Sequence, residues 1–512
     1  MQREKEAYRK ELELFREKTK SFYNGEMTVA EYKGFSGYYG SYAQRGAKQS
    51  MLRLRLTGGE IDKDKLKFIA DSIEKYGIER VHFTTCQTVQ VHDLSCEVVC
   101  DLIEEALDHD IITRGGGGDY PRNDMCAPLS GVEQGDYFDV MPYAKAAGEF
   151  LLGKIKDIKL PRKLKVCFSN SKKNETHATF RDLGFVAKEN QKFDVYCAGG
   201  LGNKPKFGVK VAEDVLPGEI LYCIQTMLDI FQAHGNYTKR SESRTRFLQD
   251  TLGVEGLKKV FAEQFEENKK KCDLDLHVTE HKVEKEGKET FAELPSRVVA
   301  QKQSGLYAVY YHPIGGVPDR NLFARLYQVM KDMEAVAIRL TPEEGLYVIN
   351  LTKEETEQVL EATKESACSR FETSTACIGA AICQVGIGNS QKMLELCVER
   401  VQKENFKPDT LPKIRISGCP SSCAGHQIGT IGLRGGKKPT EDGPKDAFAV
   451  FVDGCDLQGN EQMGQEIGVM LMDKIPEFFV KLGHAVEAAG MNYEAFAKTH
   501  GNQIIEIAKE FI

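Results

Sequence analysis

Four cysteines in the C-terminal third of the chain have the spacing of an iron–sulfur site. They form two pairs, Cys377 with Cys383 and Cys419 with Cys423, and glycine, proline or serine residues punctuate both segments. Such segments suit tight loops, and four thiolates supply one ligand to each iron of a 4Fe-4S cluster. Zinc is one alternative, although zinc ribbons favour pairs separated by two residues. Buried cysteines that serve only packing are another. The spacing favours the cluster.

Basic residues alternate with apolar residues in two strand-like segments. Arg53 and Arg55 alternate with leucines, and Lys163 and Lys165 alternate with a leucine and a valine. A period of two places the basic side chains of a strand on one face. Arginine binds oxyanions with a planar fork, and lysine supplies a mobile charge and protons. Taken alone, each pattern is that of an amphipathic strand with a solvated charged face.

A run of four glycines, 115–118, lies between the two basic segments and leads to Arg122. Four consecutive glycines argue against a regular helix or strand and suit a backbone that approaches a ligand closely. A flexible surface loop is the alternative.

In these motifs the chain resembles the sirohaem- and iron–sulfur-containing sulfite and nitrite reductases. The resemblance rests on Thr375-Ala-Cys377-(x5)-Cys383 and on Ser417-Gly-Cys419-Pro-Ser-Ser-Cys423. It extends from about residue 34 to the C-terminal domain, with the motifs in the expected order. It implies that the four cysteines hold the 4Fe-4S cluster and that Cys423 also bridges to the sirohaem iron.

The resemblance also implies roles for the basic residues. Matching the family motifs, Arg53, Arg122, Lys163 and Lys165 would surround the substrate on the open side of the haem. There they would bind the oxyanion, neutralise charge as electrons arrive and relay protons as oxygen departs as water.

The segment 84–92 resembles the strand of the family that contacts sirohaem. Thr84, Thr85 and Gln90 keep the identities or the polarity that the family has there. We therefore expect these three residues to contact sirohaem.

Two arginines of the family are absent from this region. Cys86 and His82 stand at their positions, so two expected partners of the haem carboxylates are missing. Either other arginines such as Arg55, Arg80 or Arg114 compensate, or the haem carries altered peripheral groups. Arg55 is the one that we include among the expected cofactor-binding residues.

A repeat in pattern indicates that the chain is duplicated. Gly58-Gly59 is followed by a helix pattern and a strand pattern, and Gly315-Gly316 is followed by the same order at an offset of 257 residues. The apolar stripe of the first helix pattern is preserved at the same offset. Further echoes are Leu160-Pro161-Arg162-Lys163 with Leu411-Pro412-Lys413-Ile414, and Phe193-Asp-Val-Tyr with Phe448-Ala-Val-Phe. A chance match of two common units is the alternative.

The duplication and the resemblance together predict an α+β fold with two pseudo-symmetric halves. Each half would contain a ferredoxin-like αβ unit and a larger α/β domain that binds sirohaem and the 4Fe-4S cluster. A lysine- and glutamate-rich stretch, 262–292, would be a solvated connector or helix surface. The expected parts are a helical arm (1–47), the first ferredoxin-like repeat (48–112), a sirohaem- and substrate-binding domain (113–300), the second repeat (305–366) and a domain binding the cluster and sirohaem (367–512).

Composition restricts the class of protein. The formal charge of −7 argues against a protein that coats nucleic acid. No apolar run reaches the ~18 residues of a membrane span, and the charged N-terminus lacks the apolar core of a signal peptide. The 15 cysteines are an odd number in a long chain, so reduced thiols or metal ligands are expected instead of disulfides. We therefore expect a cytoplasmic protein.

The function expected first is the six-electron reduction of sulfite to sulfide. The nitrite enzymes of the family tend to carry Lys-x-Asn where this chain has Lys163-Leu-Lys165, and a second lysine favours the doubly charged sulfite. Reduction of nitrite to ammonia is the alternative. No complete flavin or nicotinamide motif occurs, so an external donor such as a ferredoxin or a flavoprotein is expected. From another class, an iron–sulfur redox sensor without sirohaem remains open because of Cys86 and His82.

Overall fold

The computed structural model describes residues 2–279 and 283–512, which divide into two units. The large unit contains residues 2–200, 205–311 and 319–364 within the described ranges, and the small unit contains 201–204, 312–318 and 365–512. Each unit is described by itself below. Within the described residues, no helix is both long and apolar enough to cross a membrane.

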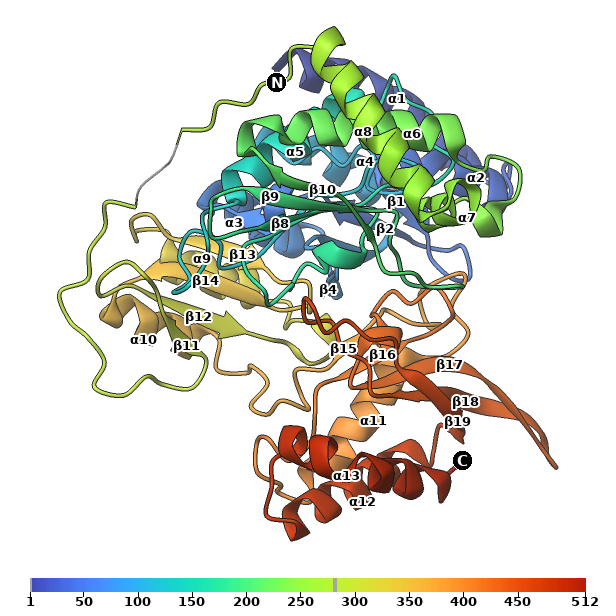
Figure 1. Ribbon diagram of the computed structural model, residues 1–512, viewed down its shortest axis with the longest axis vertical. Helices are drawn as coiled ribbons and strands as arrows, with labels where there is room; N and C mark the ends of the chain where they lie inside the picture. Colours follow the sequence, from blue (N-terminus) through green and yellow to red (C-terminus); the bar gives the residue numbers. More distant parts are fainter. Residues whose placement is uncertain (1, 280–282) are drawn as a thin grey trace. The chain divides into compact units, whose positions relative to one another are not determined.

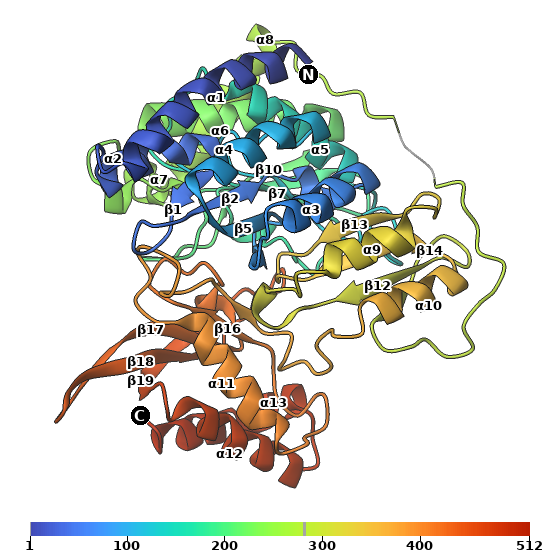
Figure 2. The same cartoon turned by 180° about the vertical axis from the view of Figure 1, so that it is seen from behind.

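The chain begins with two helices of the large unit. In α1 (Gln2–Tyr23), Tyr8, Leu12 and Phe15 follow a helical stripe, and all three are buried. A capping box of Thr28 and Glu31 starts α2 (Val29–Ser36). Figure 2 shows α1 running beside α4 (Cys96–Glu105). The stretch 2–36 thus contains an amphipathic helix and a capped short helix.

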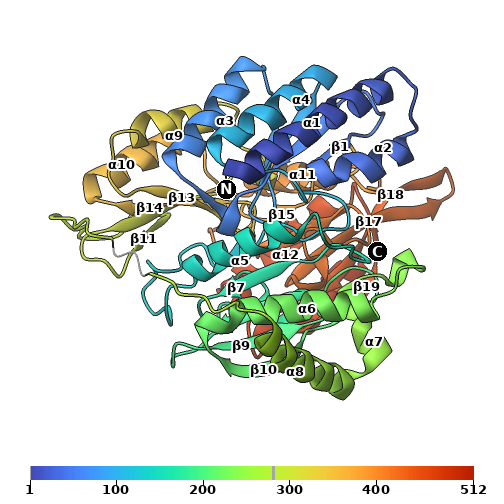
Figure 3. The ribbon, with the colours of Figure 1, turned by 90° about the horizontal axis from the view of Figure 1, so that it is seen from above.

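Two antiparallel sheets of the large unit have the same plan. The first has the order β1-β2-β5-β4 and carries α3 and α4, and the second has the order β11-β12-β14-β13-β3 and carries α9 and α10. In Figure 3 the helices α9, α3 and α4 lie side by side. The bounds are β1 (Ser41–Ala43), β2 (Ser50–Leu54), β3 (Glu60–Ile61), α3 (Lys63–Lys75), β4 (Val81–Phe83), β5 (Val89–Leu94), β11 (Val298–Ala300), β12 (Tyr307–Tyr311), α9 (Leu322–Met330), β13 (Ala337–Leu340), β14 (Leu346–Leu351) and α10 (Lys353–Ala362).

Matching side-chain contacts confirm that these two sheets are repeats. Gln44 donates to the Asp93 carboxylate (2.7 Å) and accepts from the Asp93 N–H (2.9 Å). Gln301 donates to the Asn350 side chain (2.9 Å) and accepts from the Asn350 N–H (2.7 Å). Asp93 and Asn350 also share a positive φ, 61° and 63°. Both pairs are related by the offset of 257 residues that the glycine pairs predicted.

A five-stranded sheet of order β10-β9-β8-β7-β6 completes the large unit. Its strands β6, β7 and β8 are parallel, and β9 and β10 are antiparallel to their neighbours. The helices α5, α6 and α8 lie on one face of this sheet (Figure 1). The bounds are β6 (Met125–Cys126), α5 (Met141–Lys154), β7 (Val166–Ser169), β8 (Leu183–Ala187), β9 (Phe193–Cys197), β10 (Val209–Val215), α6 (Ile220–His234), α7 (Leu248–Leu252) and α8 (Val254–Lys271).

The small unit repeats this sheet with the order β15-β16-β17-β18-β19. Again the first three strands are parallel and the last two are antiparallel to their neighbours. The helices α11, α12 and α13 lie on one face (Figure 1). The bounds are β15 (Thr375–Ala376), α11 (Ser390–Gln402), β16 (Ile414–Ser417), β17 (Ile431–Thr440), β18 (Gly443–Val452), β19 (Gln465–Leu471), α12 (Ile475–Ala488) and α13 (Tyr493–Lys509).

The predicted α+β fold with two pseudo-symmetric halves is therefore confirmed. Strand register places Cys197 opposite Leu183 and Val452 opposite Ile431, so Phe193 and Phe448 are equivalent, as their echo indicated. The other echo is out of register by three residues. β6 pairs with β7 in the same register as β15 pairs with β16. This register makes Lys163 equivalent to Leu411, whereas the echo had aligned it with Ile414.

The predicted connector, 262–292, begins inside a helix. Its first residues belong to α8, which ends at Lys271, and the described residues that follow are irregular. Residues 280–282 lie outside the described part of the chain.

Candidate functional site

The two cysteine pairs leave the sheet of the small unit at one edge. β15 and β16 are parallel neighbours, so their carboxyl ends meet, and each strand leads directly into a cysteine pair. The Cys377 N–H donates to the Ile416 carbonyl (3.1 Å), and the Cys383 N–H donates to the Gly379 carbonyl (2.9 Å). Parallel pairing thus brings together two cysteine loops that lie far apart in the sequence.

Glycines let these two loops meet backbone against backbone. The N–H groups of Ile387 and Gly388 both donate to the Gly418 carbonyl (2.9 and 2.8 Å). A Cβ at Gly418 would lie 2.6 Å from the Gly388 carbonyl oxygen, and a Cβ at Gly388 would lie 2.8 Å from the Gly435 Cα. No side chain fits at either position, so the glycines fix the distance between the cysteine loops.

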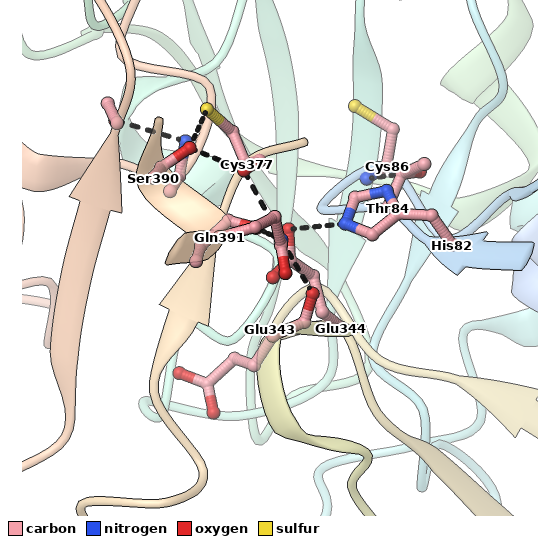
Figure 4. Close-up of polar contacts among 12 residues, drawn as sticks. His82, Thr84, Cys86, Glu343, Glu344, Cys377, Ser390 and Gln391 are labelled. Atoms are coloured by element: carbon pink, nitrogen blue, oxygen red, sulfur yellow. Dashed lines mark hydrogen bonds and ion pairs between the residues drawn. The ribbon is translucent and has the colours of Figure 1, made fainter. Parts of the chain in front are cut away.

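The Cys377 sulfur has two polar neighbours. The Gly418 N–H donates to it (3.2 Å), and the Ser390 hydroxyl lies 3.2 Å away (Figure 4). Burial and the nearby Cys423 raise the pKa of the Cys377 thiol to about 12. An N–H donor aimed at sulfur stabilises a thiolate that binds a positive centre, so this environment suits an iron ligand.

The start of α11 supports this loop, a role that the sequence analysis missed. Ser390 Oγ donates to the Cys377 carbonyl (2.6 Å), and Gln391 Nε2 donates to the carbonyls of Ala376 (2.7 Å) and Gly315 (2.9 Å). The available signal was Asn389, whose side chain caps the helix.

Within the described residues, no three His, Cys, Asp or Glu side chains converge closely enough to hold a single metal ion.

The first half has no cysteines at the equivalent positions. Ala127 and Glu133 make the backbone hydrogen bonds that Cys377 and Cys383 make in the second half. By the same register, Ser171 and Glu175 correspond to Cys419 and Cys423. Glu133 forms an ion pair with Lys173. The duplicated loop is thus an ion-pairing segment in one copy and a cysteine loop in the other.

A group of arginines in the large unit is arranged around the glycine run. Arg53 and Arg122 both donate to the Gly116 carbonyl, and Arg122 also donates to the Gly118 carbonyl (2.7 Å). With its amide turned so that the oxygen faces β2, Gln90 accepts from Arg53 Nε (3.1 Å) and Nη2 (2.6 Å). Burial lowers the pKa of Arg122 to about 10. The structure therefore brings together three of the predicted residues.

Lys165 contacts Cys86 in the same unit. Their side chains are hydrogen-bonded, and Arg181 and Arg53 lie close enough to act on the thiol. Burial raises the pKa of Cys86, but Lys165 and Arg181 lower it more, so that it falls to about 6. Burial lowers the pKa of Lys165. Cys86, which Figure 4 labels, stands where the family has an arginine, and its thiol has cations as neighbours.

The cationic group of the large unit consists of Arg53, Arg122, Lys165, Arg181 and Arg244. Its members Arg181 and Arg244, and the carboxylate of Asp182 beside them, were missed by sequence reasoning. Arg244 Nη2 donates to both oxygens of the fully buried Asp182 carboxylate (3.1 and 3.0 Å), which also accepts from the Lys165 N–H (2.9 Å). Arg181 Nε donates to the Thr176 carbonyl (3.0 Å). The cations come from separate loops, so no local spacing indicated them.

The three arginines expected to compensate for Cys86 and His82 contact protein groups. Arg55 is buried and donates to the carbonyls of Arg114 (3.4 Å), Pro121 (3.1 Å) and Arg122 (2.9 Å). Arg114 pairs with the Glu11 carboxylate (3.1 Å), and Arg80 lies 3.7 Å from the Asp93 carboxylate.

The remaining predicted residues lie at or near the turn between β4 and β5 and before β7. Thr84 Oγ1 lies 2.7 Å from Thr88 Oγ1, and Thr85 and Lys163 are half-buried. His82 is buried, with Nε2 3.8 Å from the buried Glu344 carboxylate (Figure 4). His82 therefore has a carboxylate of the protein itself as its neighbour.

Comparisons with known proteins agree with this architecture. Residues 42–109 match the model of the nitrite/sulfite reductase ferredoxin-like half domain, and residues 117–269 match that of the nitrite and sulphite reductase 4Fe-4S domain. The segments 42–109 and 117–269 are thus domains of the sulfite and nitrite reductase family. Its members are oxidoreductases that use a 4Fe-4S cluster and sirohaem. The cysteine loops and the buried cations fit those two groups.

The similar proteins carry both names. Ferredoxin–nitrite reductase of Synechococcus elongatus is 23% identical over 79% of this chain and 80% of its own length. Sulfite reductase [ferredoxin] of Mycobacterium tuberculosis is 22% identical over 76% and 70%. Chloroplastic ferredoxin–nitrite reductase of Spinacia oleracea is 26% identical over 79% and 69%. The solved structure of Mycobacterium tuberculosis NirA protein superposes with a TM-score of 0.76 at 21% identity, covering 91% of this chain and 89% of that one.

Proposed function

We propose that this reductase catalyses the six-electron reduction of sulfite to sulfide. The observation that carries the proposal is the cationic group of the large unit. Lys165 and Arg53 both act on the Cys86 thiol, and Arg53 and Arg122 both donate to the Gly116 carbonyl. A buried set of cations from separate segments costs free energy unless an anion balances it. Sulfite is a small, doubly charged oxyanion of that kind.

In this proposal Arg53 and Arg122 bind the oxyanion, and Lys163 and Lys165 supply protons. Burial lowers the pKa of Lys165, so its ammonium group releases a proton more readily than a solvated lysine does. The backbone of Lys165 is fixed by the buried Asp182 carboxylate. The lysine is thus held near the substrate position while its ammonium group remains able to exchange a proton.

The cofactor contacts are proposed residue by residue. Cys377, Cys383, Cys419 and Cys423 hold the 4Fe-4S cluster, and Cys423, the exposed thiol of its pair, also ligates the sirohaem iron. Thr84, Thr85, Gln90 and Arg55 contribute to the sirohaem site; for Arg55, which already donates to backbone carbonyls, this role is indirect. When bound, the two groups would pass electrons from an external donor to the oxyanion.

Several finer points belong to the same proposal. The electrons come from an external donor, either a ferredoxin, as the names of relatives indicate, or a flavoprotein. We also propose that the protein is cytoplasmic. Its domains are proposed to have the boundaries that were predicted from the sequence. Nitrite reduction to ammonia by the same groups is the second candidate, because relatives of similar identity carry that name.

Steady-state kinetics with one artificial electron donor test the choice of substrate. The enzyme is purified anaerobically with its cofactors, and kcat/KM is measured for sulfite and for nitrite. We expect the higher value for sulfite. A higher value for nitrite would replace sulfite by the second candidate, and chlorin-like absorption bands would be absent if the protein were a sensor without sirohaem.

Replacement of Lys165 by asparagine tests the proton-donating role. Because a positioned acid contributes about 100-fold or more, Lys165→Asn should lower sulfite turnover by about that factor while iron and sirohaem contents stay unchanged. Lys172→Asn removes an exposed lysine seven residues away and should leave turnover unchanged. Wild-type turnover in Lys165→Asn would contradict the assignment.

A further inference from the structure

The N-terminal helix is joined to the glycine run by a buried charge. Glu11 of α1 accepts both hydrogen bonds that Arg114 Nη2 donates to it (3.2 and 3.1 Å), and the side chain of Arg114 is only 3% exposed. Lys156 and the Tyr38 hydroxyl (2.9 Å) also contact the Glu11 carboxylate. Glu11 is therefore the centre of a small network that links the arm to the residue preceding Gly115.

Arg114 depends on this carboxylate for its charge balance. Its guanidinium carbon lies 4.3 Å from the centre of the Tyr8 ring, and the Tyr8 hydroxyl lies 3.1 Å from Thr113 Oγ1. Arg114 Nε has no hydrogen-bond partner among the described residues. Removal of the negative charge at Glu11 would leave a buried cation without an opposite charge, which is costly.

The glycine run that follows Arg114 is packed against another segment of backbone. The Gly115 N–H donates to the Tyr38 carbonyl (2.7 Å), and the Gly118 N–H donates to the Tyr42 hydroxyl (2.6 Å). A Cβ at Gly117 would lie 2.6 Å from the Gly37 carbonyl oxygen. The four glycines thus allow a close approach of two backbones, and their carbonyl groups point in directions that this packing sets.

Those carbonyl groups hold the two arginines of the cationic group. Arg53 and Arg122 donate to the Gly116 carbonyl, and Arg122 also donates to the Gly118 carbonyl. A shift of the run would therefore rotate both guanidinium groups together.

We propose that Glu11 is a positioning residue for the oxyanion-binding arginines. Glu11 fixes Arg114, Arg114 fixes the start of the glycine run, and the run orients Arg53 and Arg122. The N-terminal arm thereby contributes to the anion affinity of a site that it does not itself line. The inference rests on the proposed function of Arg53 and Arg122.

The test replaces Glu11 by glutamine in the full-length holoenzyme. Glutamine keeps the size and an acceptor for Tyr38 but removes the charge that balances Arg114. We expect hydrogen exchange in a peptide spanning 113–120 to accelerate about tenfold, and the KM for sulfite to rise about tenfold. The kcat at saturating sulfite and the iron and sirohaem contents should change little. Should Glu11→Gln fail to accumulate, Glu11→Asp is measured in the same way, with smaller shifts in the same direction.

Arg9→Gln is the matched control. Arg9 tethers the same helix to Asp108 (2.7 Å) and Glu104 (3.4 Å) at the surface and does not touch the glycine run. This variant should leave both the exchange rate and the KM unchanged. If Arg9→Gln moved both as far as Glu11→Gln does, the arm would act by general stability, and the positioning role would be rejected.

A parallel variant, Arg122→Gln, separates the two levels of inference. Wild-type exchange and KM in Glu11→Gln, with a raised KM in Arg122→Gln, would overturn the positioning role alone. A wild-type KM in Arg122→Gln would overturn the proposed function of the arginines. Raised exchange and a raised KM in Glu11→Gln, together with a raised KM in Arg122→Gln, support the positioning role.

Discussion

At the scale of single residues, the position of Cys86 shows how neighbours change the chemistry of a side chain. A half-buried thiol ordinarily resists ionisation, but Lys165 and Arg181 stabilise its anion more than burial opposes it, and its pKa falls to about 6. A thiolate at neutral pH compensates part of the surrounding positive charge. The site therefore carries less net charge than one with an arginine at this position.

Alkylation measures this shift directly. The rate at which iodoacetamide modifies Cys86, followed by peptide mass spectrometry, should rise from pH 5 to 7 and then level off, because the thiolate is the reactive form. In Lys165→Met the levelling should move to a higher pH, since the main stabilising charge is gone. A rate that keeps rising to pH 9 in the unmodified protein would contradict the lowered pKa.

Asp124 is a second residue whose surroundings set its charge. Burial raises its pKa to about 6, although Arg55 acts in the opposite direction. A carboxyl whose folded pKa exceeds its unfolded value of about 4 stabilises the fold fully below that value, and this contribution is lost as pH rises through about 6. Asp124→Asn keeps an acceptor for the Gly58 N–H and should remove this part of the pH dependence. The free energy of unfolding of both proteins is measured by urea denaturation between pH 4 and 7. If it changed with pH to the same extent in both proteins, the raised pKa of Asp124 would be rejected.

At the scale of elements, paired loops and not isolated residues form the candidate sites. β15 and β16 bring two cysteine loops to one sheet edge, and glycines set the distance between the loops. The glycine run at 115–118 shows the same principle in the large unit, where it was expected to approach a ligand. In the structure it approaches another backbone segment and offers its carbonyl groups to arginines. Its approach to a ligand stays a prediction.

Gly418→Ala tests the close contact of the cysteine loops. The added Cβ would lie 2.6 Å from the Gly388 carbonyl oxygen, so the loops must separate and the bound iron and acid-labile sulfide should fall by half or more, as roughly expected for a shifted ligand set. Gly436→Ala on β17 is the control, because its Cβ would have 4.0 Å to the nearest atom. Equal loss in both variants would show that the contact is not specific.

At the scale of the whole molecule, the two copies of the duplicated unit have diverged in chemistry. The second copy carries the cysteines, and the first carries the cationic group and has an ion pair at the equivalent loop. Under the proposed function, the second copy would hold the cluster and the first would bind the oxyanion.

Equivalent substitutions in the two copies test this division. Cys419→Ser should abolish the iron–sulfur absorption and most of the bound iron, since one of four proposed ligands is lost. Ser171→Ala, at the corresponding position of the first copy, should leave the iron content unchanged. Iron retention in Cys419→Ser would remove this cysteine from the ligand set.

Local pattern was sufficient for much of the fold. The predicted stripe of α3, which includes Leu66, Ile69 and Ile73, is buried, and so are Phe323 and Leu326 at the same offset in α9. These features are readable from the sequence because helix and strand periods are properties of neighbouring residues. The glycine pairs likewise marked the repeat because they occupy turns with positive φ.

The partners of the buried charges were decided by tertiary structure alone. Arg244 reaches Asp182 across 62 residues, and Arg114 reaches Glu11 across 103. A buried charge must find an opposite charge, but which one reaches it depends on how distant segments pack, and no local spacing encodes that. The residue types and periods along the chain therefore determined the duplicated α+β fold and the cysteine motif, whereas packing decided that Arg55 and Arg114 serve the protein's own backbone and arm and that Cys86 lies beside Lys165.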